Sequence, residues 1–294
     1  MNTTGSTERI TVRQIKAEDV DRCGVIAFEA HRDVAARHNV PCEQPSVEFS
    51  TGLIRAKLAD PNAFGMVAEY ANNLVGSVFL NTFSPAPVAS VGPLTVSPDA
   101  PPGVGRTLMT ELLADERASR FASIRLVQSP SHLHSLGLYA KLGFVVREPL
   151  VLMQGACPPS KLDSTCTVRS ATQEDLSSCA RVAERVFGFS RDFELRNAIG
   201  QKVATVIDRG GKITGYATGL GFRGHAAALT TVELMMLMAV TPQLPGPGFF
   251  VPTRNGELLR WLLDGGLRME WPAMLMSRGD WEQGSGAFLP SIAF

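Results

Sequence analysis

Two glycines one residue apart stand where a strand-like segment gives way to a helical pattern. They are Gly103 and Gly105, in the stretch S-P-D-A-P-P-G-V-G-R-T-L-M. The β-branched run V-G-P-L-T-V precedes them, and Val104, Leu108 and Leu112 then fall on one helical face. Because glycine permits positive φ and has no Cβ, successive N–H groups at a helix start can converge on one anion. The pattern therefore predicts a phosphate-binding turn.

Neither of the common nucleotide-binding fingerprints fits this turn. A P-loop requires Gly-Lys-Ser/Thr, which the sequence lacks, and a dinucleotide fingerprint requires a third glycine where Leu108 stands. The alternative is an ordinary tight connection between a strand and a helix, and the two glycines alone do not decide between these interpretations.

The elements expected around the turn form an α+β domain. Strands are expected at residues 10–14, 65–70, 74–82, 88–96 and 123–127, near 145, and at 150–154. Helices are expected at residues 17–37, 47–58, 104–120 and 131–142.

An internal repeat suggests that this domain occurs twice. T-V-R-Q-I-K-A-E-D-V-D-R-C near the start is answered by T-V-R-S-A-T-Q-E-D-L-S-S-C, in which six residues recur in register. Gly76 is answered by Gly215, and G-L-Y-A-K-L-G-F by R-W-L-L-D-G-G-L. We therefore expect domains at residues 1–154 and 165–294, joined by a linker at 155–164. The alternative is that these echoes are generic signals of strands and helix ends.

The glycine turn, together with the downstream L-Y-A-K-L-G-F, resembles the GNAT superfamily of acyl-CoA-dependent N-acyltransferases. In that family a strand, a Gln/Arg-x-x-Gly-x-Gly/Ala turn and a helix hold the coenzyme A pyrophosphate, and a later helix ends in Tyr-x-x-x-Gly-Phe. The resemblance covers residues 10–154 and, through the repeat, the second half. It implies two tandem GNAT-like domains, each a mixed, mostly antiparallel sheet flanked by helices.

The resemblance implies acetyl-CoA or coenzyme A as co-substrate, without a metal. The implied cofactor-binding residues are Leu94, Thr95, Val96, Gly103, Val104, Gly105, Arg106, Thr107 and Ser135. Backbone N–H groups near Leu94 or Val96 are expected to meet the thioester oxygen. The sequence departs from the family at Ala100, where Gln or Arg is usual, and at Pro101 and Pro102, which lack an N–H. His132 and Ser135 stand where the family often has Asn and Ala.

Tyr139 is the catalytic residue that the resemblance implies. A phenol with a pKa of about 10 can donate its proton to the departing thiolate. The alternative role is a core aromatic with its hydroxyl at the surface. The candidates for a general base are Glu29, His31, His38, Glu69, His132 and His134. A water chain, or an acceptor amine of low pKa, would need no dedicated base.

The second half lacks both the glycine turn and the tyrosine of the late helix. Leu262 falls where Tyr139 stands in the first half, and R-G-H-A-A-A-L-T-T-V-E-L-M runs into an apolar segment without a G-x-G turn. We therefore expect a degenerate copy that lost its cofactor site. Met235, Met236 and Met238 are expected to be buried helix packing, and the closing A-F-L-P-S-I-A-F is expected to pack as a strand.

Composition excludes several other classes of function. Lys+Arg and Asp+Glu both number 28, which argues against nucleic-acid or membrane partners. The five cysteines form no C-x-x-C pair, and no H-E-x-x-H motif occurs, so neither a disulfide scaffold nor a zinc site is expected. No apolar run approaches the length of a membrane span. A cytoplasmic protein, with a homodimer as a possible assembly, is the expectation.

The function expected from these features is direct transfer of an acetyl or short acyl group from acyl-CoA to a primary amine of a small molecule or peptide. The chemistry belongs to the first half, and no covalent enzyme species is involved. Two alternatives stay open: a non-catalytic acyl-CoA sensor or binding module, and a structural pseudo-enzyme that binds no coenzyme A.

Overall fold

The computed structural model describes residues 9–39, 42–83, 85–129, 133–160, 165–241 and 246–294. The chain forms two compact units. Unit 1 comprises Met1–Thr82 and Ala89–Phe121, and unit 2 comprises Phe83–Val88 and Ala122–Phe294. Part of the expected linker, residues 161–164, lies outside the described residues, and the domain boundary there stays a prediction.

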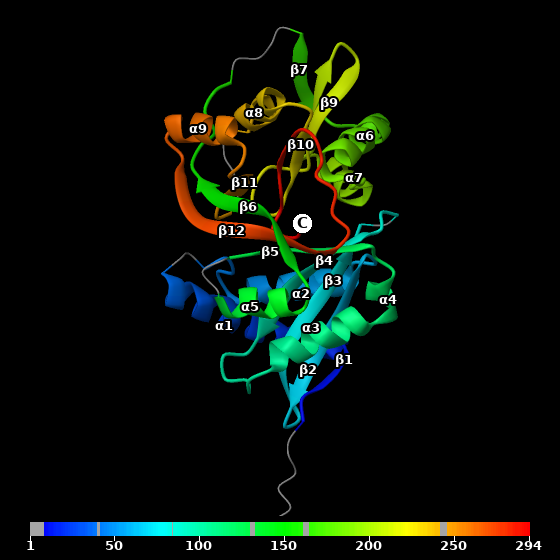
Figure 1. Cartoon of the computed structure of the whole chain (residues 1–294), viewed down its shortest axis with the longest axis vertical. Coiled ribbons are helices and arrows are strands. Elements are labelled where there is room, and N and C mark those ends of the chain that lie inside the picture. Colours follow the sequence, from blue (N-terminus) through cyan, green and yellow to red (C-terminus); the bar gives the residue numbers. More distant parts are fainter. Residues whose placement is uncertain (1–8, 40–41, 84, 130–132, 161–164, 242–245) are drawn as a thin grey trace, which may run out of the picture. The chain divides into compact units, whose positions relative to one another are not determined.

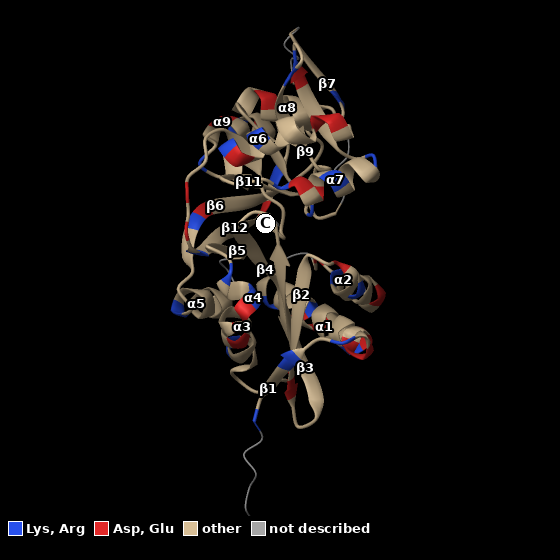
Figure 2. Cartoon of the chain, turned by 90° about the vertical axis from the view of Figure 1, so that its right-hand side faces the viewer, with Lys and Arg blue, Asp and Glu red and all other residues tan. Residues whose placement is uncertain are grey.

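Unit 1 contains four antiparallel strands with helices on both faces. The strand order is β1 (Thr11–Gln14), β2 (Ala63–Tyr70), β3 (Asn73–Thr82) and β4 (Val88–Val96). Figure 2 shows α1 (Val20–His38) and α2 (Val47–Ala59) on one face, and α3 (Val104–Ala114) and α4 (Glu116–Ser119) on the other. One hydrophobic cluster joins α1 and α2 to the sheet through Ile15, Val20, Cys23, Ile54, Val67 and Phe79.

The sequence predicted one helix at residues 104–120, and this was wrong. Asp115 has an extended conformation, with ψ of 141°, and ends α3. Its carboxylate then accepts the N–H of Arg117 at 2.9 Å and so caps α4. An aspartate that can hydrogen-bond a backbone N–H competes with helix continuation, which explains the break.

Unit 2 contains two further groups of antiparallel strands (Figure 1). The first has the order β5 (Ser123–Gln128), β12 (Arg268–Gly279), β6 (Val145–Gln154) and β11 (Phe249–Pro252). The second has the order β13 (Ala287–Leu289), β10 (Ala226–Ala228), β9 (Lys212–Ala217), β8 (Thr205–Arg209) and β7 (Cys166–Ser170). The helices are α5 (Leu133–Lys141), α6 (Leu176–Phe187), α7 (Asp192–Gly200), α8 (Thr231–Ala239) and α9 (Gly256–Asp264).

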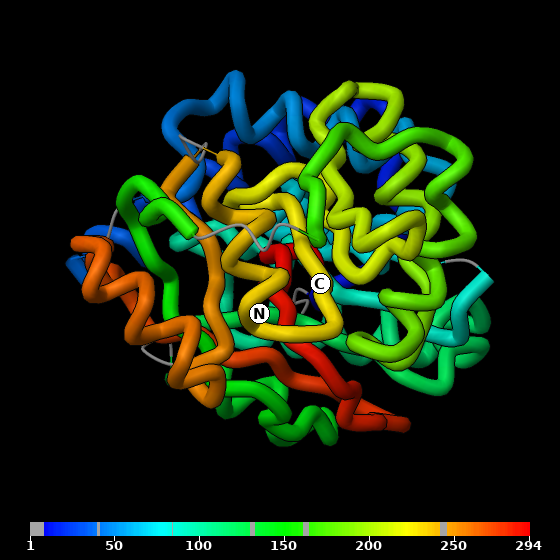
Figure 3. The backbone as a smooth tube through the Cα atoms, turned by 90° about the horizontal axis from the view of Figure 1, so that it is seen from above, coloured from blue at the N-terminus to red at the C-terminus, as the bar shows by residue number. Residues whose placement is uncertain are grey.

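The strand expected at the end of the chain is shorter than predicted, because β13 covers only Ala287–Leu289 and residues 290–294 form no strand. β13 pairs with β10, from Ala226 opposite Leu289 to Ala228 opposite Ala287, and Figure 3 shows the chain's red C-terminal segment. Met235, Met236 and Met238 are buried in α8, as expected. The strands expected near residue 145 and at 150–154 are one continuous strand, β6.

The long strands β6 and β12 each pair only with strands from the other half of the sequence. β12 pairs with β6 from Arg268 to Ser277 and, on its other edge, with β5 from Met274 to Gly279. β6 in turn pairs with β11 on its other edge. Hence β12, from the second half, lies between β5 and β6, and β6, from the first half, lies between β11 and β12. β6 and β12, which follow the equivalent helices α5 and α9, are thus exchanged between the two halves.

The repeated Thr-Val-Arg motif has the same geometry in both copies. Arg13 Nη1 lies 2.7 Å from Asp19 Oδ2, and Arg169 Nη1 lies 2.8 Å from Asp175 Oδ2. Each aspartate also accepts a backbone N–H, at 2.7 Å and 2.8 Å, just before its helix begins. The predicted tandem fold is therefore confirmed at the level of individual contacts.

The helix ends that precede β6 and β12 also correspond. Gly143 and Gly266 have φ of 86° and 88°, left-handed values that favour glycine. The N–H of Phe144 donates to Tyr139 O at 3.0 Å, and that of Leu267 donates to Leu262 O at 3.1 Å. Leu262 thus occupies in α9 the position of Tyr139 in α5, as the sequence predicted.

Asp175→Asn is expected to lower the free energy of unfolding by about 2 kcal/mol at pH 7. The Arg169 guanidinium lowers the pKa of the Asp175 carboxyl to about 2. A depressed pKa contributes stability above the unfolded-state value near 4, and this stability is lost as the pH falls toward 2. Urea unfolding between pH 2 and 7 should therefore show a flatter profile for the variant. Glu174→Gln, at the exposed neighbouring position, should keep the wild-type profile.

Candidate functional site

Strand β4 presents two backbone amides away from its neighbour β3. Ser97 donates its N–H to Val75 O at 2.8 Å, on the β3 side. Because successive amides of a strand point to opposite edges, the N–H groups of Leu94 and Val96 point away from β3. Thr95 between them is buried, with its Oγ1 3.0 Å from Ser77 Oγ. These are the amides that were expected, from the sequence, to donate hydrogen bonds to the thioester oxygen.

A β-bulge bends β4 just before these amides. Phe79 of β3 faces Gly92 and Pro93 together, because the register shifts between its two neighbours. The side-chain amide of Asn81 donates to Gly92 O at 2.9 Å and fixes the bulge. A bulge increases local twist and turns a strand away from regular pairing, so it re-aims the segment that begins at Leu94.

The glycine turn leads into a helix start that has no side-chain cap. Gly103 is the N-cap of α3 with φ of 101°, and the first turn carries no acidic residue. The first intrahelical hydrogen bond runs from Thr107 N–H to Gly103 O at 2.9 Å. The N–H groups of Val104, Gly105 and Arg106 precede it and have no acceptor within the helix. The sequence expected the Thr107 amide among the donors, but its N–H is already used.

The N-terminus of the corresponding helix in the second copy is capped by side chains of the same segment. Gly76 pairs with Val96 and Gly215 pairs with Ala228, which makes β4 and β10 equivalent. After β10 the helix α8 begins directly, and Thr230 Oγ1 accepts the N–H of Glu233 at 3.2 Å.

Glu233 is buried at the start of α8 and adds negative charge there. Its Oε2 accepts the Thr230 hydroxyl at 2.9 Å, and its Oε1 lies 3.5 Å from Arg209 Nη2. Glu233 is the third residue of α8, as Arg106 is of α3. A helix start that already holds a buried carboxylate repels a second anion. This capping of α8 was not predicted, although T-T-V-E is a local capping signal.

Tyr139 lies on α5 in unit 2 and is 8% exposed. Its ring packs edge-on against Phe144, with centroids 5.9 Å apart. Burial raises the pKa of Tyr139 to about 12, so the hydroxyl stays protonated at neutral pH. Ser135 lies one helical turn earlier and is half-buried. The structure thus places Leu94–Val96 and the glycine turn in unit 1, and Tyr139 and Ser135 in unit 2.

Two of the candidate bases are engaged in structural contacts. Glu69 forms an ion pair with Arg13, at 2.7 Å. His31 Nδ1 lies 2.8 Å from Ala27 O, a contact that requires the proton on Nδ1. The Nε2 lone pair then accepts the Gln44 side-chain amide at 3.1 Å. Both ring nitrogens of His31 are therefore engaged, and the Glu69 carboxylate is held by Arg13 through Oε1.

The other described candidate bases lie on two different helices. Glu29 and His38 lie on α1, and His134 is exposed on α5. His132 lies outside the described residues. Within the described part of the chain, no three His, Cys, Asp or Glu side chains gather as metal ligands would. The described helices include none long and apolar enough to cross a membrane.

Residues 32–144 match the model of the Acetyltransferase (GNAT) family. The chain therefore contains a GNAT acetyltransferase domain, and its class is that of the acyl-CoA-dependent N-acetyltransferases. The match includes the bulged strand, the glycine turn and Tyr139.

Solved structures extend the likeness to almost the whole chain. A putative acetyltransferase from Pyrococcus horikoshii has 18% sequence identity and a TM-score of 0.70, over 94% of this chain and 91% of that one. A GCN5-related N-acetyltransferase from Sphaerobacter thermophilus has 12% identity and a TM-score of 0.60, over 94% and 97%. A tandem GNAT protein from the clavulanic acid biosynthesis pathway has 13% identity and a TM-score of 0.57, over 92% and 98%. At these identities the likeness shows the tandem fold. None of the curated proteins matches the chain.

Proposed function

We propose that this protein transfers an acetyl or other short acyl group from acyl-CoA directly to a primary amine of a small molecule or peptide. The reaction belongs to the first copy, residues 1–154, and the second copy, residues 165–294, has lost its cofactor site. The observation that carries this assignment is the contrast between two equivalent helix starts. That of α3 is uncapped and carries Arg106, whereas that of α8 is capped by Thr230 and carries the buried Glu233.

The uncapped turn fits a pyrophosphate. Three backbone N–H groups at a helix start, from Val104, Gly105 and Arg106, lie at the positive end of the helix dipole. The Arg106 side chain is exposed and adds a full positive charge. Gly103 enters the helix from the left-handed region, a conformation that residues with a Cβ rarely adopt. Coenzyme A would supply the activated thioester, and these residues would hold its diphosphate.

The amides of Leu94 and Val96 are the proposed donors to the thioester oxygen. Backbone N–H groups fixed in a strand are preorganised dipoles, so they stabilise developing negative charge without reorganising. The bulge at Gly92 and Pro93 turns this part of β4 out of regular register. In this role the two amides raise the rate of attack on the carbonyl carbon rather than only the affinity for the substrate.

Tyr139 is the proposed proton donor to the departing thiolate. Because burial keeps its hydroxyl protonated, the proton is in place whenever the thiolate forms. With Glu69 and His31 engaged elsewhere, the amine is expected to lose its proton to water or to bind already neutral. We place the reaction in the cytoplasm, because the five cysteines are free thiols.

A panel of amines incubated with acetyl-CoA and analysed by mass spectrometry tests the proposed function. The panel should contain amino acids, polyamines, aminoglycosides and lysine peptides, and at least one is expected to gain an acetyl group in an enzyme-dependent manner. Calorimetric titration with coenzyme A runs alongside it. Saturable binding without transfer to any amine would favour a sensor, and absence of binding would favour a pseudo-enzyme.

A further inference from the structure

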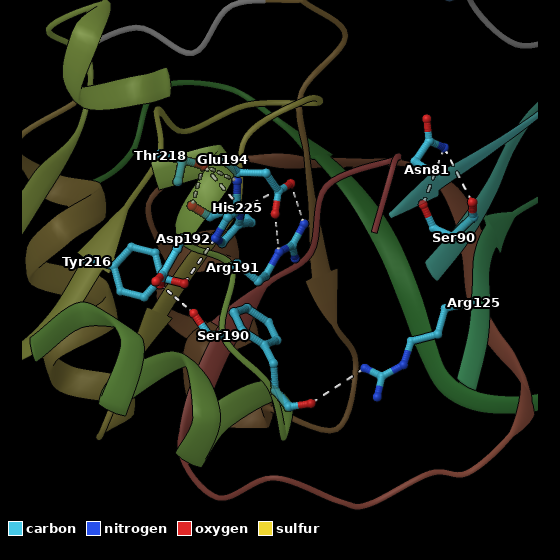
Figure 4. A network of polar contacts seen from close by, with 11 residues as sticks. Asn81, Ser90, Arg125, Ser190, Arg191, Asp192, Glu194, Tyr216, Thr218 and His225 are labelled. Carbon is cyan, nitrogen blue, oxygen red and sulfur yellow. Dashed lines mark hydrogen bonds and ion pairs between the residues drawn. The ribbon is translucent and has the colours of Figure 1, made fainter. Parts of the chain in front are cut away.

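Unit 2 contains a buried arginine without an acidic partner (Figure 4). Arg125, on β5, is 4% exposed. Its Nε lies 3.3 Å from Ser123 Oγ and its Nη1 lies 3.5 Å from Phe187 O, two long contacts with neutral acceptors. Among the described residues no carboxylate lies within ion-pair distance of it. Burying a guanidinium without an anionic partner is energetically costly, so the site is incomplete as it stands.

Aromatic rings surround this guanidinium. It lies 4.7 Å from the ring centroid of Phe189, 4.6 Å from that of Trp281 and 5.2 Å from that of Phe294. Cation–π contacts offset part of the lost hydration but leave the net charge unchanged. Arg125, Trp281 and Phe294 also line a surface hollow, together with Phe187, Phe288 and the acidic Glu282.

Arg191 adds a second buried guanidinium beside the first. Its Nε and Nη2 each lie 2.6 Å from a carboxylate oxygen of Glu194. Its Nη1 is buried and has no hydrogen-bond partner among the described residues. The Arg191 guanidinium lies 5.1 Å from the centroid of Phe294, the ring that Arg125 also contacts. An orphaned buried donor is rare in folded proteins, and a bound water or anion would satisfy it.

The two buried guanidiniums differ in their pairing. Glu194 pairs with Arg191, whereas Arg125 forms no ion pair with a described residue, and Glu282 is the acidic residue that lines the same hollow. Arg147 is near enough to act on Arg125 electrostatically, while its Nε donates to Ser277 Oγ at 2.9 Å. Burial, together with the charges of Arg191 and Arg147, lowers the pKa of Arg125 to about 9. One bound monoanion would offset the charge that the fold leaves unpaired.

We propose that Arg125 and Arg191 bind the carboxylate of a small organic acid whose apolar part packs against Phe187, Trp281 and Phe294. A planar carboxylate can accept two parallel N–H bonds from one guanidinium, which suits the unused donors here. The aromatic walls favour an acid with an apolar body over a hydrated inorganic anion. The proposal does not depend on acyl transfer, since it concerns binding by residues that the proposed reaction does not use.

Calorimetric titration of the full chain, without acetyl-CoA, tests the proposal with three probes: benzoate, propionate and inorganic phosphate. Benzoate is expected to bind saturably and more tightly than propionate. Arg125→Met is expected to weaken benzoate binding about tenfold or more, because the charge-assisted hydrogen bonds are lost. In carboxylate-free buffer this variant should unfold at the wild-type temperature or above, because an apolar side chain replaces an unpaired buried charge.

Arg125→Lys and Arg268→Met complete the set of variants. Lysine keeps the positive charge but lacks the paired, planar N–H donors of the guanidinium. Its affinity for benzoate should therefore fall between those of the wild type and Arg125→Met. If Arg125→Met does not fold, the benzoate affinity of Arg125→Lys tests the proposal in its place. Arg268 carries the same charge on β12 with a side chain 75% exposed, and its loss should leave affinity unchanged. Absence of carboxylate binding, wild-type affinity in both Arg125 variants, or a preference for phosphate would overturn the proposal.

Discussion

Arg106→Glu is expected to weaken coenzyme A binding about thirtyfold or more while leaving the protein at least as stable as before. The substitution gives α3 the same residue type at its third position as α8 has at Glu233. The three N–H donors stay in place, but a carboxylate now faces the diphosphate where a guanidinium stood. A carboxylate near a helix N-terminus is favourable for the helix itself, so affinity and stability should change in opposite directions.

Coenzyme A titrations and thermal unfolding of four proteins check this expectation. Coenzyme A affinity is measured calorimetrically for the wild type, Arg106→Glu and the intermediate Arg106→Gln, and thermal unfolding is measured without ligand. The control is Glu233→Gln in the second copy, which should reduce stability without changing coenzyme A affinity. Equal affinities in all four proteins would refute the assignment of the turn. Loss of both affinity and stability in Arg106→Glu would show a folding defect instead.

Tyr139→Phe is expected to lower kcat about a hundredfold, with KM for acetyl-CoA nearly unchanged. Phenylalanine keeps the buried ring and its edge contact with Phe144, so the fold should be unaffected. What disappears is the hydroxyl proton, which burial holds in place at neutral pH. The effect should therefore fall on the step in which the thiolate departs.

Steady-state kinetics on the amine identified in the panel measures this effect. Tyr70→Phe, at the end of β2, removes a phenol elsewhere and should leave kcat unchanged. Because the pKa of Tyr139 is about 12, its ionisation should not reduce the wild-type rate between pH 7 and 10. A wild-type kcat in Tyr139→Phe would exclude the proton-donor role and leave the ring as packing.

The repeats that the sequence indicated correctly lie in contiguous residues. The matched Thr-Val-Arg segments form equivalent Arg–Asp ion pairs, and the matched glycines Gly143 and Gly266 both have left-handed φ. Such motifs depend on local backbone geometry, so one short window of sequence is enough to indicate them. The break at Asp115 was missed although D-E-R is also a local capping signal.

The features that could not be predicted depend on partners far along the chain. Arg125 sits in an ordinary strand pattern, S-I-R-L-V-Q, and its partners Phe189, Trp281 and Phe294 come from remote segments. The pairing of β12 with both β5 and β6 likewise has no signature in any of the three strands, because pairing partners are chosen by the assembled sheet. The sequence T-T-V-E contains a capping signal for α8, but it does not indicate that the Glu233 side chain is buried.

The position of β12 between β5 and β6 has a consequence for biosynthesis. β6 ends at Gln154 and β12 ends at Gly279, so the ribosome must add the intervening residues before this sheet can close. At ordinary elongation rates that takes roughly 6 to 25 seconds, during which β5 and β6 are without their shared neighbour. Exposed strand edges of this kind invite pairing with other chains. A truncation that removed the second copy would therefore also remove the strand that lies between β5 and β6.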